Sequence, residues 1–249
     1  MNRKNVYHVR TATCVLLALI LSFTAAVTVS AAGWEEALKK CTTYKFGDSR
    51  EALTQVANAV KASSGNRGER LQIEKAFVKI LNDEKATLEC KDFICRQLWV
   101  IGTKESVPAL AKMLTVKETS DMARYALETN PANEAVKALR DAMKDAEGAA
   151  LVGIIDSLGE RRDRESVSAI SKLVFIAEEK YEDEDKEKVK EKEKQAKQVA
   201  LAAINALGKI GGDEAAKTLA EARKTMNPEI NRAATQALLL WGDNLNSGH

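Results

Sequence analysis

Apolar residues recur at helical spacing along most of the chain, and residues 151–174 show the pattern most clearly. Four apolar residues of this stretch fall at i, i+3, i+4 and i+7: Leu151, Ile154, Ile155 and Leu158. This spacing places them on one face of a helix. Residues 159–163 are polar, and a second apolar stripe begins at Val167. Because the polar break is short, the second helix is expected to return antiparallel to the first, and the stretch predicts a helical hairpin.

The same hairpin recurs along the chain. Leucines occupy equivalent places in five stretches: Leu98, Leu127, Leu158, Leu207 and Leu238. These register leucines are separated by 29, 31, 49 and 31 residues. Nine residues beyond each of the first four stands an apolar anchor of the second helix: Val107, Val136, Val167 and Ala216. A two-helix unit with a period of about 30 residues predicts an all-α superhelix, a solenoid of antiparallel hairpins that cover one another's apolar faces.

Glycines follow three of the register leucines by four residues, at Gly102, Gly211 and Gly242. Glycine adopts the left-handed backbone conformation without a Cβ penalty. We therefore expect each of these glycines to close the first helix of its hairpin.

The stretch Ala-Leu-Gly-Lys-Ile-Gly at 206–211, followed by an acidic residue and by alanine in the second helix, resembles the HEAT repeats of the phycobilisome-lyase type. The resemblance covers about residues 86–242. It implies a right-handed superhelical array used mainly as a protein-interaction scaffold and, in one branch, as a bilin lyase subunit. Two turns depart from the Ile-Gly of the pattern, with Asn130 and Pro131 in one and Arg161 and Arg162 in the other. The sequence shows no bilin-handling motif, so the resemblance concerns the fold more than the function.

Residues 33–85 precede the regular repeats and are expected to cap the N-terminal end of the array. Three helices are predicted there, split at Gly47 and across residues 63–68. Trp34, Leu38 and Cys41 form an i, i+4, i+7 stripe that would cover the first hairpin. A ligand groove at Trp34 is the alternative interpretation of this stripe. HEAT-like repeats are expected over residues 86–249.

A charged insertion interrupts the repeats at about residues 176–195 and accounts for the longest interval. Nine of its side chains are acidic and six are lysine. Opposite charges at i+3 and i+4, such as Asp183 with Lys186 and Glu184 with Lys188, favour a solvated helix. We expect a helical extension that runs into residues 196–207.

Residues 1–32 have the features of a secretory signal. A basic start with Arg3, Lys4 and Arg10 precedes an apolar run over residues 14–29 and the small residues at 30–32. Cleavage is expected near Gly33, and the alternative is an uncleaved anchor. The apolar run is shorter than the ~20 residues that a spanning helix needs. The sequence therefore predicts a secreted or periplasmic protein.

The charge balance gives no indication of a nucleic-acid partner. Residues 1–32 contain three basic and no acidic side chains, so 38 basic residues become 35 against 36 acidic ones, a net charge of −1 after cleavage. Acidic and basic residues alternate along the same predicted helices, which leaves no basic stripe for a phosphate backbone.

Histidine is nearly absent from the predicted fold, because His8 lies in the signal and His249 is the last residue. This absence excludes histidine-based acid–base catalysis, Ser/His or Cys/His nucleophile pairs and histidine zinc sites. We therefore predict no catalytic residues, no metal site and no cofactor. The predicted function is a non-catalytic protein-interaction scaffold of the periplasm or cell envelope. The alternative is a lyase-like enzyme or cofactor-handling subunit related to bilin lyases.

Three cysteines follow the signal, Cys41, Cys90 and Cys95. Cys90 and Cys95 differ by five positions and point about 140° apart on one helix, so they cannot bridge each other. One hypothesis is a disulfide between Cys41 and Cys90, with Cys95 as a small buried hydrophobic residue.

A polar residue stands two positions before each register leucine: Arg96, Tyr125, Asp156, Asn205 and Gln236. These residues predict either a ladder of hydrogen bonds between stacked helices, with Arg124 or Arg96 pairing with Asp156, or a polar stripe that grips a partner's extended segment.

Two further surfaces are candidates for protein partners. The turn with Arg161, Arg162 and Arg164 suits carboxylate or phosphate recognition, although the arginines could also be simply solvated. At the C-terminal end, Leu239 and Trp241 belong to a first helix without a returning second helix. We expect an uncovered apolar face there that docks another protein or a second copy in a two-fold dimer.

Overall fold

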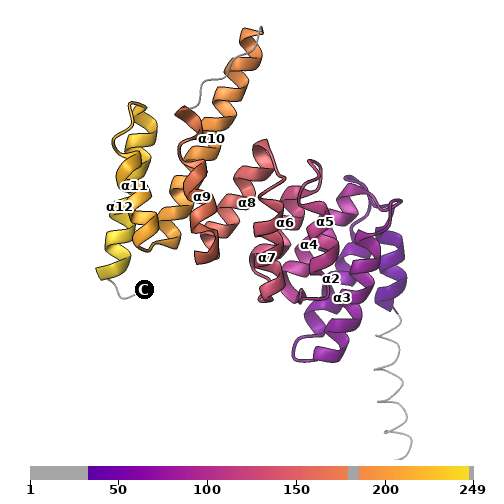
Figure 1. Cartoon of the computed structure of the whole chain (residues 1–249). Coiled ribbons are helices and arrows are strands. Elements are labelled where there is room, and N and C mark those ends of the chain that lie inside the picture. The colour runs from indigo at the N-terminus through magenta and orange to yellow at the C-terminus, as the bar shows by residue number, and fades with distance from the viewer. Residues whose placement is uncertain (1–32, 179–184, 247–249) are drawn as a thin grey trace, which may run out of the picture.

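All regular structure in the described residues, 33–178 and 185–246 of the computed structural model, is helical (Figure 1). The signal expected at residues 1–32 lies outside these residues. Successive helices pair, and the pairs stack side by side from the indigo N-terminal end to the yellow C-terminal end. The all-α solenoid that the apolar pattern predicts is confirmed.

Three helices form the N-terminal part, as predicted. They are a helix over residues 33–41, α2 (Glu51–Ala62) and α3 (Arg67–Leu81). Trp34 is buried, so the stripe at the start of the chain belongs to the core and the alternative of a ligand groove at Trp34 is wrong. The start of α3 is a reciprocal cap: the Asn66 side chain accepts from the backbone N–H of Glu69 and donates to the Glu69 carboxylate.

The repeats are hairpins of a first and a second helix. The first helices are α4 (Leu88–Ile101), α6 (Ser120–Glu128), α8 (Gly148–Glu160), α10 (Lys186–Ile210) and α12 (Pro228–Asn246). The second helices are α5 (Val107–Met113), α7 (Asn133–Ala142), α9 (Val167–Leu173) and α11 (Asp213–Ala222). Each first helix packs on the next first helix, which makes one continuous layer. The register leucines Leu98, Leu127, Leu158 and Leu207 are buried in this core, and Leu238 is partly buried.

The first helices α8, α10 and α12 touch at small residues beside the register leucines. The glycine that follows the leucine of one helix packs on the alanine that precedes the leucine of the next helix. A Cβ on Gly159 would lie 2.8 Å from the Cα of Ala206, and one on Gly208 would lie 2.9 Å from the Cβ of Ala237. Small residues therefore set the close spacing of α8, α10 and α12.

The turn glycines do not share one conformation, which corrects the expectation that all three close a helix in the left-handed region. Gly211 does so, with φ 72°. Gly102 is extended, with φ −60° and ψ 136°, and Gly242 lies inside α12, which continues to Asn246. The non-glycine residue Arg162 has φ 50° and takes the left-handed position after α8, while the N–H of Asp163 donates to the carbonyl of Leu158.

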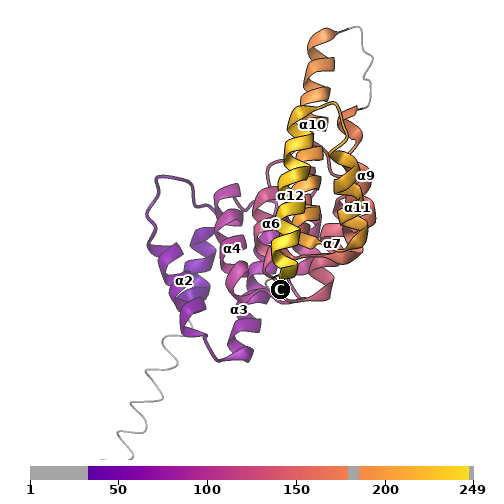
Figure 2. The same ribbon diagram turned by 90° about the vertical axis from the view of Figure 1, so that its left-hand side faces the viewer.

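The helical extension predicted from the charged insertion is confirmed for residues 186–195, which are continuous with the rest of α10. Asp183 and Glu184 lie outside the described residues. The Asp185 carboxylate caps the helix by accepting from the N–H groups of Glu187 and Lys188. Figures 1 and 2 show the first half of α10 rising beyond the neighbouring helices. Within residues 33–178 and 185–246, no helix has both the length and the apolar character needed to cross a bilayer.

Candidate functional site

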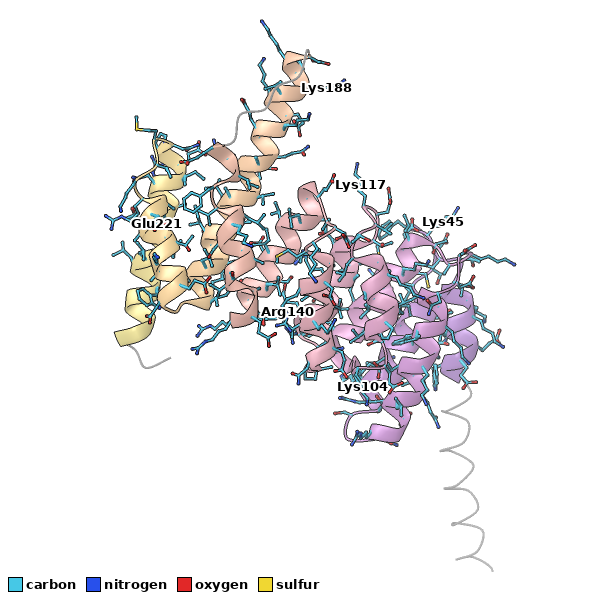
Figure 3. All side chains as sticks on the ribbon, viewed as in Figure 1. Lys45, Lys104, Lys117, Arg140, Lys188 and Glu221 are labelled. Carbon is cyan, nitrogen blue, oxygen red and sulfur yellow. The ribbon has the colours of Figure 1, made fainter. Side chains whose placement is uncertain are left out.

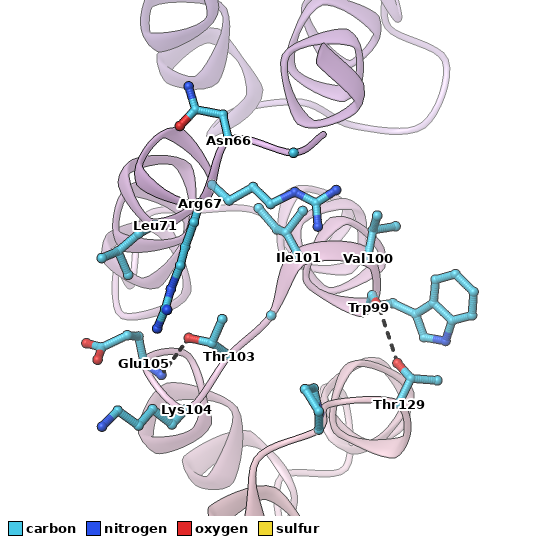
Figure 4. A pocket seen from close by; sticks show the side chains of 14 residues that line it. Asn66, Arg67, Leu71, Trp99, Val100, Ile101, Thr103, Lys104, Glu105 and Thr129 are labelled. Atoms are coloured by element: carbon cyan, nitrogen blue, oxygen red, sulfur yellow. Dashed lines mark hydrogen bonds between the residues drawn. The ribbon is translucent and has the colours of Figure 1, made fainter. Parts of the chain in front are cut away.

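A pocket of about 590 Å³ lies where the turns of three successive hairpins meet, α2–α3, α4–α5 and α6–α7 (Figure 4). It is lined by the turn before α3 and the first turn of α3, by the end of α4 with the turn that follows, and by the turn after α6. In Figure 3 the labelled Lys104 of this pocket lies at the lower edge of the array, opposite Lys117 at the upper edge. The pocket therefore belongs to one edge of the solenoid.

Exposed apolar side chains form one wall of the pocket. Trp99 is 45% exposed and Val100 is 51% exposed, both in the last turn of α4. The Trp99 ring stacks on Tyr125 of α6 with ring centroids 5.9 Å apart and planes inclined by 19°. Because Tyr125 is itself 43% exposed, the pair presents a broad apolar surface to solvent.

A buried carboxylate holds the turn that forms the floor of the pocket. Glu74 of α3 accepts from the backbone N–H of Thr103 at 2.6 Å, from the Thr103 hydroxyl at 2.8 Å and from the N–H of Ser106 at 3.1 Å. Three donors satisfy the buried carboxylate, and two of them are backbone N–H groups of the turn ahead of α5.

The third hairpin closes the same turn from the other side. The Asn130 side chain donates to the carbonyl of Thr103 at 2.9 Å, and the Thr129 hydroxyl donates to the carbonyl of Trp99 at 3.2 Å. A Cβ on Gly102 would lie 2.5 Å from the carbonyl oxygen of Leu98 and 3.2 Å from the Asn130 amide nitrogen. Close approach, and not a left-handed backbone, is therefore what requires glycine here.

Three cations line the pocket, Arg67, Arg70 and Lys104, against one carboxylate, Glu105. Figure 4 shows Arg67 reaching toward the end of α4 at Val100 and Ile101. The Nε of Arg70 is buried and has no hydrogen-bond partner among the described residues. The lining thus has three positive charges against one negative charge.

The predicted arginine turn is not one exposed surface, because Arg161 points inward. One of its terminal nitrogens donates to three backbone carbonyls at the end of α6 and the turn beyond it: Leu127 at 2.9 Å, Glu128 at 2.9 Å and Asn130 at 2.8 Å. Burial lowers the pKa of Arg161 from its usual value. The prediction of Arg161 as an exposed partner contact is wrong, because carbonyls at the end of α6 and in the turn beyond it bind this guanidinium group.

The other two arginines of the turn, Arg162 and Arg164, are exposed. They remain candidates for a partner contact. Asp163 between them accepts from Arg140 of α7 at 2.8 Å, so the turn is fixed to the preceding hairpin.

The polar positions before the register leucines do not form the predicted hydrogen-bond ladder. Arg96 pairs with Asp92 of its own helix at 2.9 Å, and Tyr125 stacks on Trp99. Burial raises the pKa of Asp156, while Asn205 and Gln236 are exposed. Hydrogen bonds between α6 and α8 involve Ser157, the residue after Asp156. Its hydroxyl donates to the Glu128 carboxylate at 2.7 Å and accepts from the Arg124 guanidinium group at 3.2 Å.

At the C-terminal end, Trp241 is not free to form an interface as predicted. Its ring packs on Gly211, so close that a Cβ there would lie 2.8 Å from the Cδ1 atom. Leu239 and Leu240 are 65% and 46% exposed. The apolar face is therefore smaller than expected and is formed by these two leucines.

The hypothesis of a Cys41–Cys90 disulfide is not supported, because Cys41, Cys90 and Cys95 are free and buried. Burial raises the pKa of Cys41 from 9.0 to about 11. Burial and, to a smaller extent, the nearby Cys41 thiol raise the pKa of Cys90 to about 12. The pKa of Cys95 rises to about 12 for the same reason, burial. All three therefore act as small buried hydrophobic residues, as predicted for Cys95.

One local feature of the sequence points to the pocket. Trp99 stands directly after a register leucine, at the position of Gly159 and Gly208. A large aromatic residue cannot fit between closely packed helices as these glycines do, so it must turn outward. In Figure 4 the Trp99 ring projects from the end of α4 on the side opposite Arg67 and Leu71, so it lies at the rim of the pocket.

Among the described residues, no group of three or more His, Cys, Asp or Glu is placed to hold a metal ion.

Residues 199–225 match the family model of the PBS lyase HEAT-like repeat. No curated protein matches the sequence of this chain. Among solved structures, a designed armadillo repeat protein is similar with a TM-score of 0.40 and 17% identity, over 83% of this chain and 99% of that one. Human deoxyhypusine hydroxylase in complex with glycerol is similar with a TM-score of 0.38 and 11% identity, over 88% of this chain and 99% of that one.

Proposed function

We propose that this HEAT-like repeat solenoid is a non-catalytic scaffold that binds protein partners in the periplasm or cell envelope. The exposed apolar surface of Trp99, Val100 and Tyr125 at the pocket carries the proposal. An exposed apolar surface that is fixed by stacking and lies beside a pocket is typical of a binding surface. The envelope location rests on the charged and apolar pattern of residues 1–32.

The array supports this role by its rigidity. Glu74, Asn130 and Arg161 each satisfy backbone groups of a neighbouring hairpin, so successive turns are joined along one edge. A surface that spans three joined hairpins is held in one shape before it binds. Preorganisation of this kind lowers the entropy cost of binding.

A photo-crosslinking amino acid at position 100 tests the proposal in the organism that makes the protein. We expect crosslinks to one or a few partner proteins, identified by mass spectrometry. The matched control is the same amino acid in place of Val116, an equally apolar residue that is 44% exposed in the turn after α5. Crosslinks that are absent at position 100, or identical at both positions, would contradict a binding surface at the pocket.

A further inference from the structure

Several cations near the turns of this molecule are already bound within the chain. Arg140 binds Asp163 at 2.8 Å, Lys209 binds Glu160 at 2.6 Å, and Arg161 binds three carbonyls. In contrast, the side chains of Arg67, Arg70 and Lys104 make no ion pair with any described residue. The pocket therefore brings together cations whose charge is available to a ligand.

One of these cations has a polar atom that is already removed from water. The Arg70 Nε is buried and lacks a hydrogen-bond acceptor in the described part of the chain. A buried polar group without a partner is unfavourable. Because Arg70 also lines the pocket, its guanidinium group is placed to meet an anionic oxygen there. Guanidinium groups also bind carboxylates with two parallel hydrogen bonds, which favours a ligand with carboxylate groups.

The apolar wall of the pocket also restricts which ligand fits, because it favours an apolar group. Trp99 and Val100 expose apolar surface on one side, while the basic side chains come from α3 and from the turn after α4. A volume of about 590 Å³ accommodates one large side chain together with the backbone on either side of it. The matching ligand has an apolar residue between carboxylates.

We propose that this pocket binds an extended acidic segment of a partner protein, with an aromatic or aliphatic side chain against Trp99 and flanking carboxylates on Arg67, Arg70 and Lys104. This inference rests on the proposed function and adds the chemistry of the partner. The net charge of the pocket lining, three positive against one negative, is complementary to such a segment.

A nucleic acid fits the same surface less well. Binding of single strands requires a basic groove that follows the phosphate backbone over several nucleotides, with successive aromatic platforms. Here three cations without an ion pair meet in one short pocket, while Arg161 and Lys209, further along the edge, are already bound within the chain. A short anionic protein segment is the better match.

Fluorescence anisotropy with a labelled peptide tests the inference. The probe is a short peptide in which glutamates flank a single tryptophan, and its control has glutamine in place of every glutamate. The test variant is Arg67→Glu with Lys104→Glu, both exposed side chains. The matched control variant is Lys217→Glu with Lys224→Glu, two exposed lysines on the α11 side of the array that change the net charge equally.

We expect the wild-type protein and the Lys217/Lys224 variant to bind the glutamate peptide alike, and the Arg67/Lys104 variant to bind it at least about tenfold more weakly. Added salt should weaken binding to the wild type. Arg67→Gln with Lys104→Gln should give an intermediate loss, and circular dichroism verifies that each variant is folded.

Four results would overturn the inference: no binding of the glutamate peptide, equal binding of the glutamine peptide, unchanged binding by the Arg67/Lys104 variant, or tighter binding of a single-stranded RNA homopolymer. If a partner crosslinks at position 100 but the glutamate peptide does not bind, the proposed function stands. Only the inference that the partner's segment is acidic would then be wrong.

Discussion

At the scale of the residue, single polar side chains satisfy the backbone at the turns of this protein. Arg161 donates to three carbonyls beyond its own hairpin, and Glu74 accepts from three donors of the next one. Such groups have no water to replace a lost partner, so their removal costs more than the removal of an exposed charge.

Arg161→Ala should therefore lower the free energy of unfolding by about 2–3 kcal/mol, because three carbonyls at the end of α6 lose a charged donor. Urea denaturation followed by circular dichroism measures the change. Arg164→Ala is the matched control, since Arg164 is exposed in the same turn and should cost less than about 0.5 kcal/mol. Equal effects of the two substitutions would show that the bonds of Arg161 contribute nothing.

The buried thiols should be unreactive in the folded protein. Their raised pKa values, about 11 for Cys41 and about 12 for Cys90 and Cys95, leave almost no thiolate at neutral pH. We expect reaction with a thiol reagent to be at least about a hundredfold slower than in denaturant. If the denatured, non-reduced protein has two reactive thiols fewer than the reduced protein, two of the cysteines form a disulfide. That result would contradict three free cysteines.

The raised pKa values of the thiols also predict how alkaline pH changes the stability of the fold. Above the unfolded pKa of 9.0 the unfolded chain loses its thiol protons, while the folded chain keeps them until about pH 11. The unfolded state then binds fewer protons than the folded state, so the free energy of unfolding should fall as the pH rises through this window. Denaturation at several pH values measures the slope, and Cys41→Ala should reduce it.

At the scale of the element, the spacing of the first helices depends on small residues at two contacts. At Gly159 and Gly208, the helices α8, α10 and α12 pack so closely that a Cβ would clash with the neighbouring helix. The first half of α10, in contrast, extends beyond this layer and is supported by its own charges, such as Lys190 with Glu187 at 2.8 Å. Packing determines one half of this helix, and local ion pairs support the other.

The substitution of glycine by alanine should consequently have opposite effects at two helical positions. Gly159→Ala places a methyl group 2.8 Å from the Cα of Ala206 and should destabilise the fold by about 1–3 kcal/mol. Gly242→Ala meets no atom within 4 Å and should stabilise the fold by up to about 1 kcal/mol through helix propensity. Thermal and urea denaturation compare the two, and destabilisation by both would contradict the assigned packing.

At the scale of the whole molecule, the solenoid is an elongated array with different surfaces at its edges and ends (Figures 1 and 3). The pocket lies on the edge that holds Lys104, and the exposed residues Leu239 and Leu240 lie on the last described helix. A partner at the pocket and a contact through α12 would therefore engage separate parts of the array.

We expect the two exposed leucines of α12 to promote self-association, the homodimer that the sequence predicts. Leu239→Glu should shift the protein to the monomer, as measured by light scattering over a range of concentrations. Leu88→Glu is the control, because Leu88 is 47% exposed at the start of α4. A wild-type protein that is monomeric at every concentration would contradict the dimer, whereas loss of the fold is not expected from either exposed position.

The sequence by itself determined the features that depend on residues close together in the chain. Apolar spacing at i, i+3, i+4 and i+7 decides which face of a helix is buried, so the hairpins, the register leucines and the helical insertion could all be predicted. The tertiary structure alone decided the features that depend on which hairpin lies beside which turn. Arg161 turned inward because carbonyls at the end of α6 and in the turn beyond it accept its guanidinium group, and Gly102 is extended in a turn that Asn130 closes. The pocket formed because the turns before α3, after α4 and after α6 meet at one edge, a contact between distant segments that no local pattern encodes.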